Sequence, residues 1–74
     1  MTNLYEARTS AGKWITQKVV ANAAGIPLRT YEALEQGTRD INKCQAMTVF
    51  QLAIALSNLT NRKYSVEDLL EYQR

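Results

Sequence analysis

Apolar residues recur at intervals of three and four along most of this 74-residue chain, which is the period of helices with one buried face. A first helix is predicted over Leu4–Ala11. Thr2 or Asn3 supplies its N-cap, and Gly12 ends it. No segment shows the two-residue alternation of a strand, so the pattern predicts an all-α fold.

Two short helices follow, with only three residues between them. They are predicted at Gln17–Ala24 and Leu28–Gln36. Thr16 is the N-cap of the first helix, and Gly25 follows its C-terminus, where a left-handed backbone is common. Pro27 suits the first turn of the second helix, because the N–H that proline lacks would have no partner there.

The second half of the chain predicts two further helices. One begins after its N-cap Asn42, has Gln45 as capping-box partner, and runs to about Ser57. A polar loop follows, and Ser65 then caps a last helix that runs to about Tyr72. The five segments together predict a single domain, built as a compact five-helix bundle.

Composition narrows the classes of function. The single Cys44 and the absence of histidine exclude an internal disulfide, the usual Cys/His metal sites and catalysis with a histidine base. Cys44 is interpreted as a small apolar residue near the start of the fourth helix, not as a redox sensor. The start of the chain is polar, and the longest apolar run, Leu52–Leu56, is too short for a membrane span. We therefore expect a cytoplasmic protein without metal, cofactor or membrane contact.

Charge is distributed unevenly along the chain. The formal net charge is +2, and all of the excess lies in residues 1–43, since residues 44–74 carry equal numbers of basic and acidic side chains. The basic residues of the first part are Arg8, Lys13, Lys18, Arg29, Arg39 and Lys43. This placement favours a nucleic-acid partner without proving one.

The central pair of helices meets the requirements of a helix-turn-helix. Ala21 is a small residue where two helix axes can cross, and Gly25 tolerates positive φ in the turn. The inner faces carry Val20, Ala24, Ile26, Tyr31 and Leu34. The outer face of the second helix then presents Leu28, Arg29, Glu32, Ala33 and Gln36. An αα-hairpin that does not bind DNA is the alternative interpretation of this pattern.

The chain resembles the phage repressor and Cro-like helix-turn-helix domains, the XRE family, over nearly its whole length. The residues that carry the resemblance are Thr16-Gln17, Ala21, Ala24-Gly25-Ile26, Arg29-Thr30-Tyr31, Glu35-Gln36-Gly37, residues 39–43, Leu52-Ala53, Ala55-Leu56 and residues 66–70. The resemblance implies a lambda-repressor-like fold in which the second and third helices form the motif. It also implies that the third helix enters the major groove of DNA.

Four features depart from the family pattern. Pro27 stands where the family has Ser or Thr, so the third helix loses a side-chain cap, and Tyr31 replaces a smaller Ile or Val. Lys13-Trp14 resembles a two-residue insertion, and the loop of residues 58–64 is longer than usual. Trp14 is interpreted as a partly packed lid over the core, with stacking on a base as the alternative.

Four residues are candidates for reading bases. Arg29 lies near the start of the third helix and suits the O6/N7 edge of guanine; the alternatives are a phosphate contact or a solvated side chain. Glu32 either accepts a hydrogen bond from cytosine N4 or repels wrong sites. Ala33 suits a thymine methyl group, and Leu28 either meets such a methyl group or packs locally.

Other residues are candidates for contacts with the sugar-phosphate backbone of DNA. The resemblance implies that Thr16 and Gln17 clamp a phosphate at the N-terminus of the second helix, where free N–H groups favour an anion. Further backbone contacts are assigned to Lys18, Gln36, Arg39 and Lys43, with Lys18 equally interpretable as a solvated charge. The resemblance also implies a structural pair, in which Arg8 of the first helix holds the near-buried Glu35.

The fourth helix carries a second apolar face. Met47, Phe50 and Ile54 recur at i, i+3 and i+7, on a different face from Leu52 and Leu56. Either the following loop covers these three residues, with Leu59 and Tyr64, or a second subunit does. They are therefore the candidate dimer face, with Leu59 or Tyr72 as further members.

Two classes of function follow from these observations. We expect a sequence-specific regulator of transcription, of repressor type, that binds double-stranded DNA as a homodimer in the cytoplasm of a bacterial or phage-type system, associated with the nucleoid. The alternative is a protein-interaction module, such as an antitoxin or anti-repressor, that uses the same fold to bind another regulatory protein. An enzyme is not expected, because no acid, base and nucleophile converge in the pattern.

Overall fold

The computed structural model describes residues 2–71 of the chain. Within these residues the protein has five α-helices, one 3-10 helix and no strand, as the periodicity predicts. The elements are α1 (Asn3–Thr9), α2 (Gln17–Ala24), α3 (Leu28–Gln36), the 3-10 helix η1 (Ile41–Lys43), α4 (Ala46–Thr60) and α5 (Val66–Leu69).

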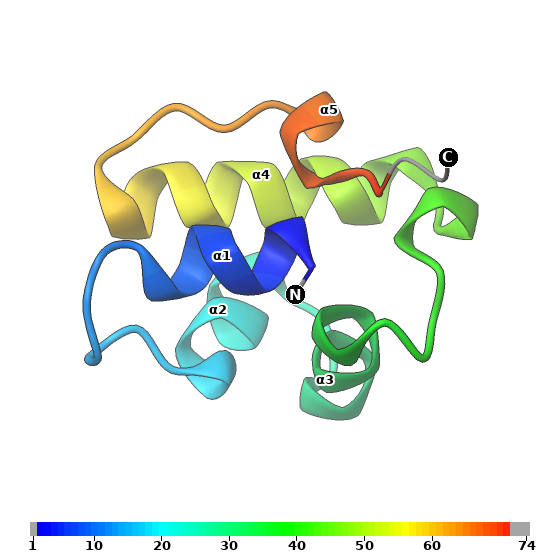
Figure 1. The fold of residues 1–74 in the computed structure, drawn as a ribbon, viewed down its shortest axis with the longest axis horizontal. Helices are drawn as coiled ribbons and strands as arrows, with labels where there is room; N and C mark the ends of the chain where they lie inside the picture. The colour runs from blue at the N-terminus through cyan, green and yellow to red at the C-terminus, as the bar shows by residue number, and fades with distance from the viewer. Residues whose placement is uncertain (1, 72–74) are drawn as a thin grey trace.

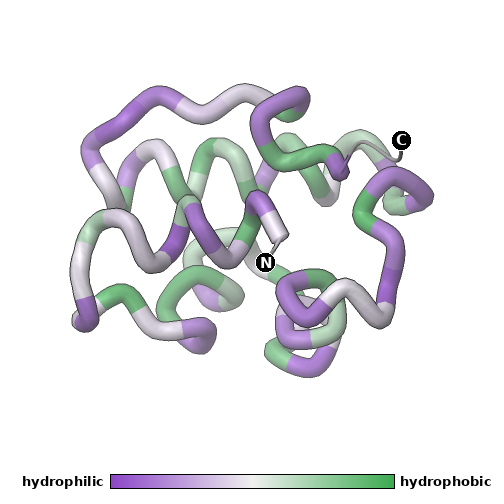
Figure 2. Tube along the Cα trace, in the orientation of Figure 1, coloured by the Kyte–Doolittle hydropathy of each residue, from purple (hydrophilic) through white to green (hydrophobic). Residues whose placement is uncertain are grey.

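The longest helix, α4, organises the molecule (Figure 1). It contacts α1, α2 and α5, while α3 packs on α1 and α2. In Figure 1 α4 runs across the view, with α5 on one side and α2 and α3 on the other. Figure 2 shows hydrophobic and hydrophilic residues alternating along the helices, since each buries one face. The core contains Leu4, Ile15, Val20, Tyr31, Leu34, Val49, Leu52, Leu56 and Leu69, each at most 2% exposed.

The ends of α2 and α3 lie where local signals predict them. The Thr16 hydroxyl accepts a hydrogen bond from the N–H of Val19 and so caps α2. Gly25 closes α2 with a left-handed backbone at φ 73°, and the N–H of Ile26 donates to the carbonyl of Ala21 (3.0 Å). Gly37, at φ 85°, ends α3 in the same way. Pro27 precedes α3 as its N-cap and gives it no side-chain cap.

The first helix is shorter than predicted, and the prediction for Trp14 is wrong. Helix α1 stops at Thr9, and Gly12 follows in a left-handed conformation at φ 128°, three residues beyond this end. Thr2 is the N-cap. Trp14 is 62% exposed, so it does not form a lid over the core.

The predicted start of the fourth helix is also wrong. Residues 41–43 form η1, whose N-cap Asp40 accepts a hydrogen bond from the N–H of Asn42, and α4 begins only at Ala46. The Asn42 side chain instead bonds to the backbone of Glu71, accepting from its N–H (2.9 Å) and donating to its carbonyl. The predicted capping box between Asn42 and Gln45 is therefore not formed. Gln45 is itself the N-cap residue of α4, and its side chain makes no capping hydrogen bond.

The last two helices differ from prediction at their C-termini. Helix α4 continues past Ser57 to Thr60 and ends where Asn61 adopts a left-handed backbone at φ 57°. The predicted capping residue Ser65 is confirmed, and it forms a capping box with Asp68. Helix α5 ends at Leu69, whereas the predicted end at Tyr72 lies outside the described residues.

The loop after α4 does not cover the second apolar face of that helix. Met47, Phe50 and Ile54 are 62%, 51% and 45% exposed. Leu59 and Tyr64, which would have covered them, pack against the main core. The N–H of Tyr64 donates to the Ser57 hydroxyl (2.9 Å) and holds the loop back along α4. The loop therefore does not bury this face, and a second subunit is the remaining predicted partner.

Residues 2–71 contain neither a membrane-spanning helix nor a group of side chains suited to a metal ion. No helix in this range is long and apolar enough to cross a membrane. Over the same range, no three acidic or cysteine side chains come together in a group that could hold a metal ion.

Candidate nucleic-acid interface

Helix α3 is divided into a buried and an outer face. Tyr31, Leu34 and Glu35 are buried and fix the helix to the rest of the domain. The outer residues include the four predicted base-reading positions, of which Leu28 and Arg29 are exposed and Glu32 and Ala33 are half-buried. The start of α3 therefore presents two exposed side chains, and the guanidinium of Arg29 forms no ion pair within residues 2–71.

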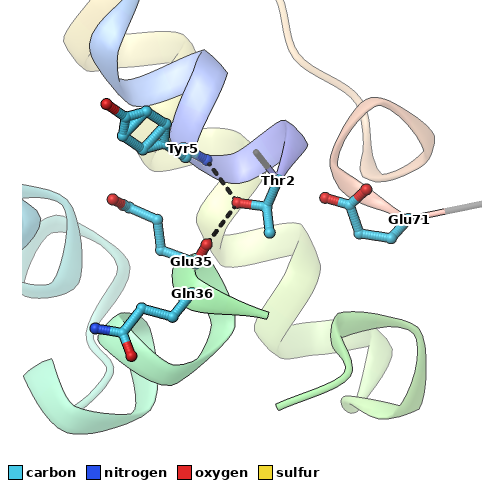
Figure 3. A pocket seen from close by; sticks show the side chains of 5 residues that line it. All are labelled: Thr2, Tyr5, Glu35, Gln36 and Glu71. Atoms are coloured by element: carbon cyan, nitrogen blue, oxygen red, sulfur yellow. Dashed lines mark hydrogen bonds between the residues drawn. The ribbon is translucent and has the colours of Figure 1, made fainter. Parts of the chain in front are cut away.

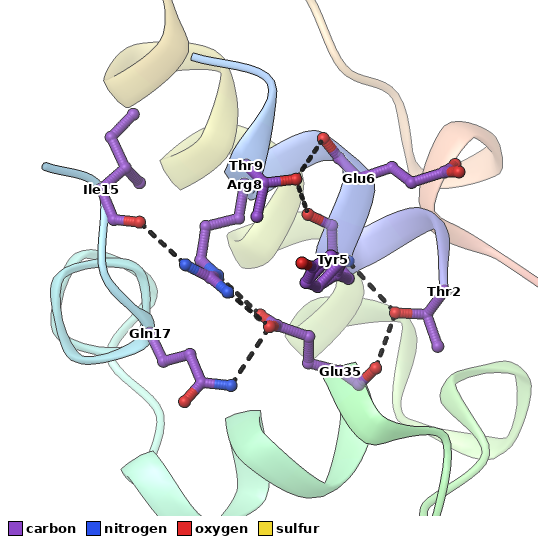
Figure 4. Close-up of polar contacts among 8 residues, drawn as sticks. All are labelled: Thr2, Tyr5, Glu6, Arg8, Thr9, Ile15, Gln17 and Glu35. Carbon is purple, nitrogen blue, oxygen red and sulfur yellow. Dashed lines mark hydrogen bonds and ion pairs between the residues drawn. The ribbon is translucent and has the colours of Figure 1, made fainter. Parts of the chain in front are cut away.

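An ion pair connects α1 to α3 (Figure 4). Arg8 donates through Nε to one Glu35 oxygen (2.8 Å) and through Nη2 to the other (2.7 Å). Its third donor, Nη1, bonds to the carbonyl of Ile15 in the segment before α2 (3.0 Å). The guanidinium also lies over the ring of Tyr5, 5.6 Å from its centroid. The predicted structural pair thus joins three segments of the chain.

Gln17, which was predicted to contact a phosphate, also bonds to this cluster. Its amide nitrogen donates to Glu35 Oε1 (3.1 Å), so the side chain turns towards the ion pair (Figure 4). The Thr16 hydroxyl already accepts from the N–H of Val19. Only the first N–H groups of α2, which have no partner within a helix, and the exposed Lys18 remain for an anion at this end.

The pKa of Glu35 lies below its ordinary value. Burial raises this pKa, but the hydrogen bonds and the charge of Arg8 outweigh the effect, with smaller contributions from Tyr31 and Gln17. The guanidinium of Arg8 in turn has a raised pKa because Glu35 accepts its hydrogen bonds. The carboxylate is therefore ionised at neutral pH, and the cluster carries a buried charge pair.

Tyr31 completes the cluster from within the core. Its hydroxyl has no hydrogen-bond partner among the described residues, although it lies close to the pair. Burial, together with the Glu35 carboxylate, raises the pKa of this phenol. The larger side chain, which departs from the pattern of the resembling family, brings a neutral polar group to the ion pair.

Acid conditions test the Glu35 assignment. Because the folded pKa is depressed, ionised Glu35 contributes its full stabilisation above the unfolded pKa of about 4.3. We expect this contribution to be lost as the pH falls through the lower folded value. Urea unfolding measured between pH 7 and pH 3 checks this, with Glu35→Gln as the control that lacks the titration. An equal pH dependence in both proteins would contradict the assignment.

A cationic cleft lies beside the start of α3. It has a volume of about 290 Å³ and is bordered by Arg39 and Lys43, which were both predicted to contact phosphates. Its other lining residues are Ile26, Pro27, Thr30, Cys44, Gln45 and Thr48. Two cations beside hydroxyl and amide groups form a suitable environment for a phosphate oxygen. The loop after α3 thus brings residues from two helices and η1 to one place.

Sequence reasoning missed three polar residues of this cleft. Thr30 was assigned no role, Gln45 was assigned to a capping box, and Thr48 was not considered. The signal for them is weak, because the cleft forms only when the starts of α3 and α4 come together. Cys44 lines the cleft half-buried, with its sulfur 3.8 Å from the carbonyl of Asp40.

Gln36 lies elsewhere. It lines an open pocket of about 600 Å³ between the start of α1, the end of α3 and Glu71 (Figure 3). Thr2 bonds there to the carbonyl of Glu35 (2.7 Å). The charged side chains that line this pocket, Glu35 and Glu71, are acidic. Gln36 therefore lies apart from the cationic cleft.

Comparison of the chain with models of known protein families, with curated proteins and with solved structures finds no match.

Proposed function

We propose that this protein is a sequence-specific DNA-binding regulator of the helix-turn-helix type, with α2 and α3 as the motif and α3 as the reading helix. The observation that carries the proposal is the placement of exposed positive charge. Arg29 lies exposed at the start of α3, and Arg39 and Lys43 border the cleft beside it. The guanidinium of Arg29 could then bind the edge of a base, while Arg39 and Lys43 bind the phosphates on either side of it.

The rigidity of α3 supports the proposal. A reading helix must hold its outer residues in a fixed register against the groove. Glu35 anchors the far end of α3 to Arg8, and Tyr31 and Leu34 are buried beneath it. Pro27 gives α3 no side-chain cap, so the position of the helix depends on these buried contacts.

Gene regulation of this kind takes place where DNA is accessible, and we propose the cytoplasm as the location. A second candidate function is a module that binds another regulatory protein. Leu28, 39% exposed at the start of α3, favours this alternative because an apolar side chain also suits a protein surface. Selection of bound sites from random duplex DNA separates the two candidates. Enrichment of a single sequence supports the regulator, whereas retention of no duplex supports the protein-binding module.

Arg29 and Arg39 are expected to make different contributions to DNA binding. Arg29→Ala should weaken binding to the selected site by about 1–3 kcal/mol and relax the preference at one base position. Arg39→Ala should weaken binding to all duplexes alike and reduce the slope of log K against log salt by about one unit. Titrations of a specific and an unrelated duplex over a range of salt concentrations measure both effects.

Arg62→Ala is the matched control, because Arg62 is exposed in the loop after α4. It should leave the sequence preference unchanged. If Arg29→Ala reduced affinity by the same factor for every sequence, Arg29 would be a phosphate contact and not a base-reading residue.

A further inference from the structure

Helix α4 has an unusual surface for an exposed helix. None of its 15 residues is charged, although 22% of the chain is charged. We call the exposed residues Met47, Phe50 and Ile54 the α4 stripe, which is 45–62% exposed. The spacing i, i+3 and i+7 places them in one row along the helix. Such a row exposes roughly 300 Å² of apolar surface, as much as the largest patch on a typical monomer.

We propose that the α4 stripe is the interface of a two-fold dimer in which the α4 helices of two identical chains pack antiparallel. The absence of charge favours a second copy as the occupant. In a two-fold interface the same surface meets itself, so charges near the axis would face like charges. The exposed neighbours of the stripe on α4 are Gln51 and Asn58, which are neutral and both donate and accept hydrogen bonds.

The direction of packing follows from the position of α3 and rests on the proposed function. Figure 1 shows α3 on the side of α4 opposite α5. A two-fold axis parallel to α4 would turn the second α3 to the opposite side of the dimer. An axis perpendicular to α4 and directed towards α3 keeps both reading helices on one side, as two half-sites on one duplex require. That axis makes the two α4 helices antiparallel.

The spacing of the stripe fixes the register. The midpoint between Met47 and Ile54 falls next to Phe50. In antiparallel packing about this point, Met47 of each chain faces Ile54 of the other, and the two Phe50 rings meet near the axis. The domain measures 30 × 22 × 22 Å, so two copies side by side can present α3 to half-sites about 34 Å apart.

The size of the stripe sets the strength of the dimer. A stable interface buries about 800 Å² on each partner, well above what the stripe offers. We therefore expect a weak dimer in solution that tightens on a palindromic duplex, where the second chain binds at high effective concentration.

Charge placed on the stripe tests the proposal. Sedimentation of the full chain should show a monomer–dimer equilibrium, and Ile54→Glu should leave only folded monomer by circular dichroism. Lys63→Gln, which changes the net charge by the same one unit in an exposed loop, should not affect the dimer. The double variant Met47→Lys/Ile54→Glu should restore dimerisation, because the new opposite charges face each other twice across the axis.

Binding to DNA gives a second measurement. Ile54→Glu should weaken binding to a palindromic duplex by about 100-fold and leave binding to a single half-site unchanged. Phe50→Gln, a neutral change at the axis, should weaken the dimer about tenfold. It replaces Ile54→Glu as the test variant if the latter lowers the melting temperature.

Two results would overturn the inference. One is a wild-type protein that stays monomeric at millimolar concentration and binds palindromes without cooperativity. The other is a dimer restored by mixing Ile54→Glu with Ile54→Lys but not by the double variant, because that outcome means parallel helices. A dimer that follows the predicted pattern in a protein that binds no duplex would support the interface and refute only the proposed function.

Discussion

Replacing Arg8 by alanine is expected to lower the free energy of unfolding by about 3–5 kcal/mol. The Glu35 side chain is only 4% exposed, and Arg8 supplies two of its hydrogen bonds and its counter-charge. Without Arg8 the carboxylate would remain buried with the amide of Gln17 as its one remaining side-chain donor of good geometry among the described residues. Chemical denaturation at pH 7 measures the loss.

The cause of that loss can be separated from the loss of side-chain packing. In Arg8→Ala the pKa of Glu35 should rise above its ordinary value, since burial then acts with little opposition. The variant should therefore become more stable relative to wild type as the pH is lowered. Replacing Arg8 and Glu35 together by leucine should restore most of the stability, because no charge is then buried without a partner. If Arg8→Ala and the double variant were equally unstable, packing and not charge would be responsible.

Gly25→Val is expected to destabilise the fold by about 2–3 kcal/mol. Gly25 has φ 73°, a conformation that β-branched residues adopt only under strain. A Cβ atom at this position would meet nothing within 4 Å, so the cost comes from the backbone and not from a clash. Thermal and urea unfolding measure the effect.

A graded series tests that explanation. Gly25→Asn should cost least, because asparagine tolerates the left-handed region, and Gly25→Ala should fall between asparagine and valine. As there is open space around the site, side-chain volume alone predicts no such order. If valine unfolded at the same temperature as wild type, the turn between α2 and α3 would not depend on the positive φ of Gly25.

The sequence by itself determined the elements whose ends are fixed by nearby atoms. Helices α2 and α3 have their predicted bounds because Thr16 caps a neighbour three residues away and because Gly25 and Gly37 can adopt positive φ. Ser65 caps α5 for the same reason. The resemblance also implied the pair of Arg8 and Glu35, which local periodicity could not have supplied because the two residues are 27 positions apart.

Only the tertiary structure decided the residues that had a choice of partners. Asn42 could have capped a helix, but it bonds to Glu71, 29 residues away, so the start of α4 moves to Ala46. Gln17 was predicted only as a phosphate contact, and the packed structure adds a hydrogen bond from its amide to the buried carboxylate of Glu35, 18 residues away. Both partners lie far away in the sequence, so only the folded chain brings them within hydrogen-bond distance, and the bond of Gln17 is favoured further because its acceptor is a buried charge.

The same distinction holds for exposure. The period of α4 predicted two apolar faces, but it did not determine whether the second face is buried by the following loop or by a second subunit. Leu59 in the last turn of α4 and Tyr64 in the loop after it pack against the core, and Phe50 and Ile54 stay exposed. The period specifies which residues share a face, whereas burial depends on what else lies within contact distance, and only the packed chain determines that.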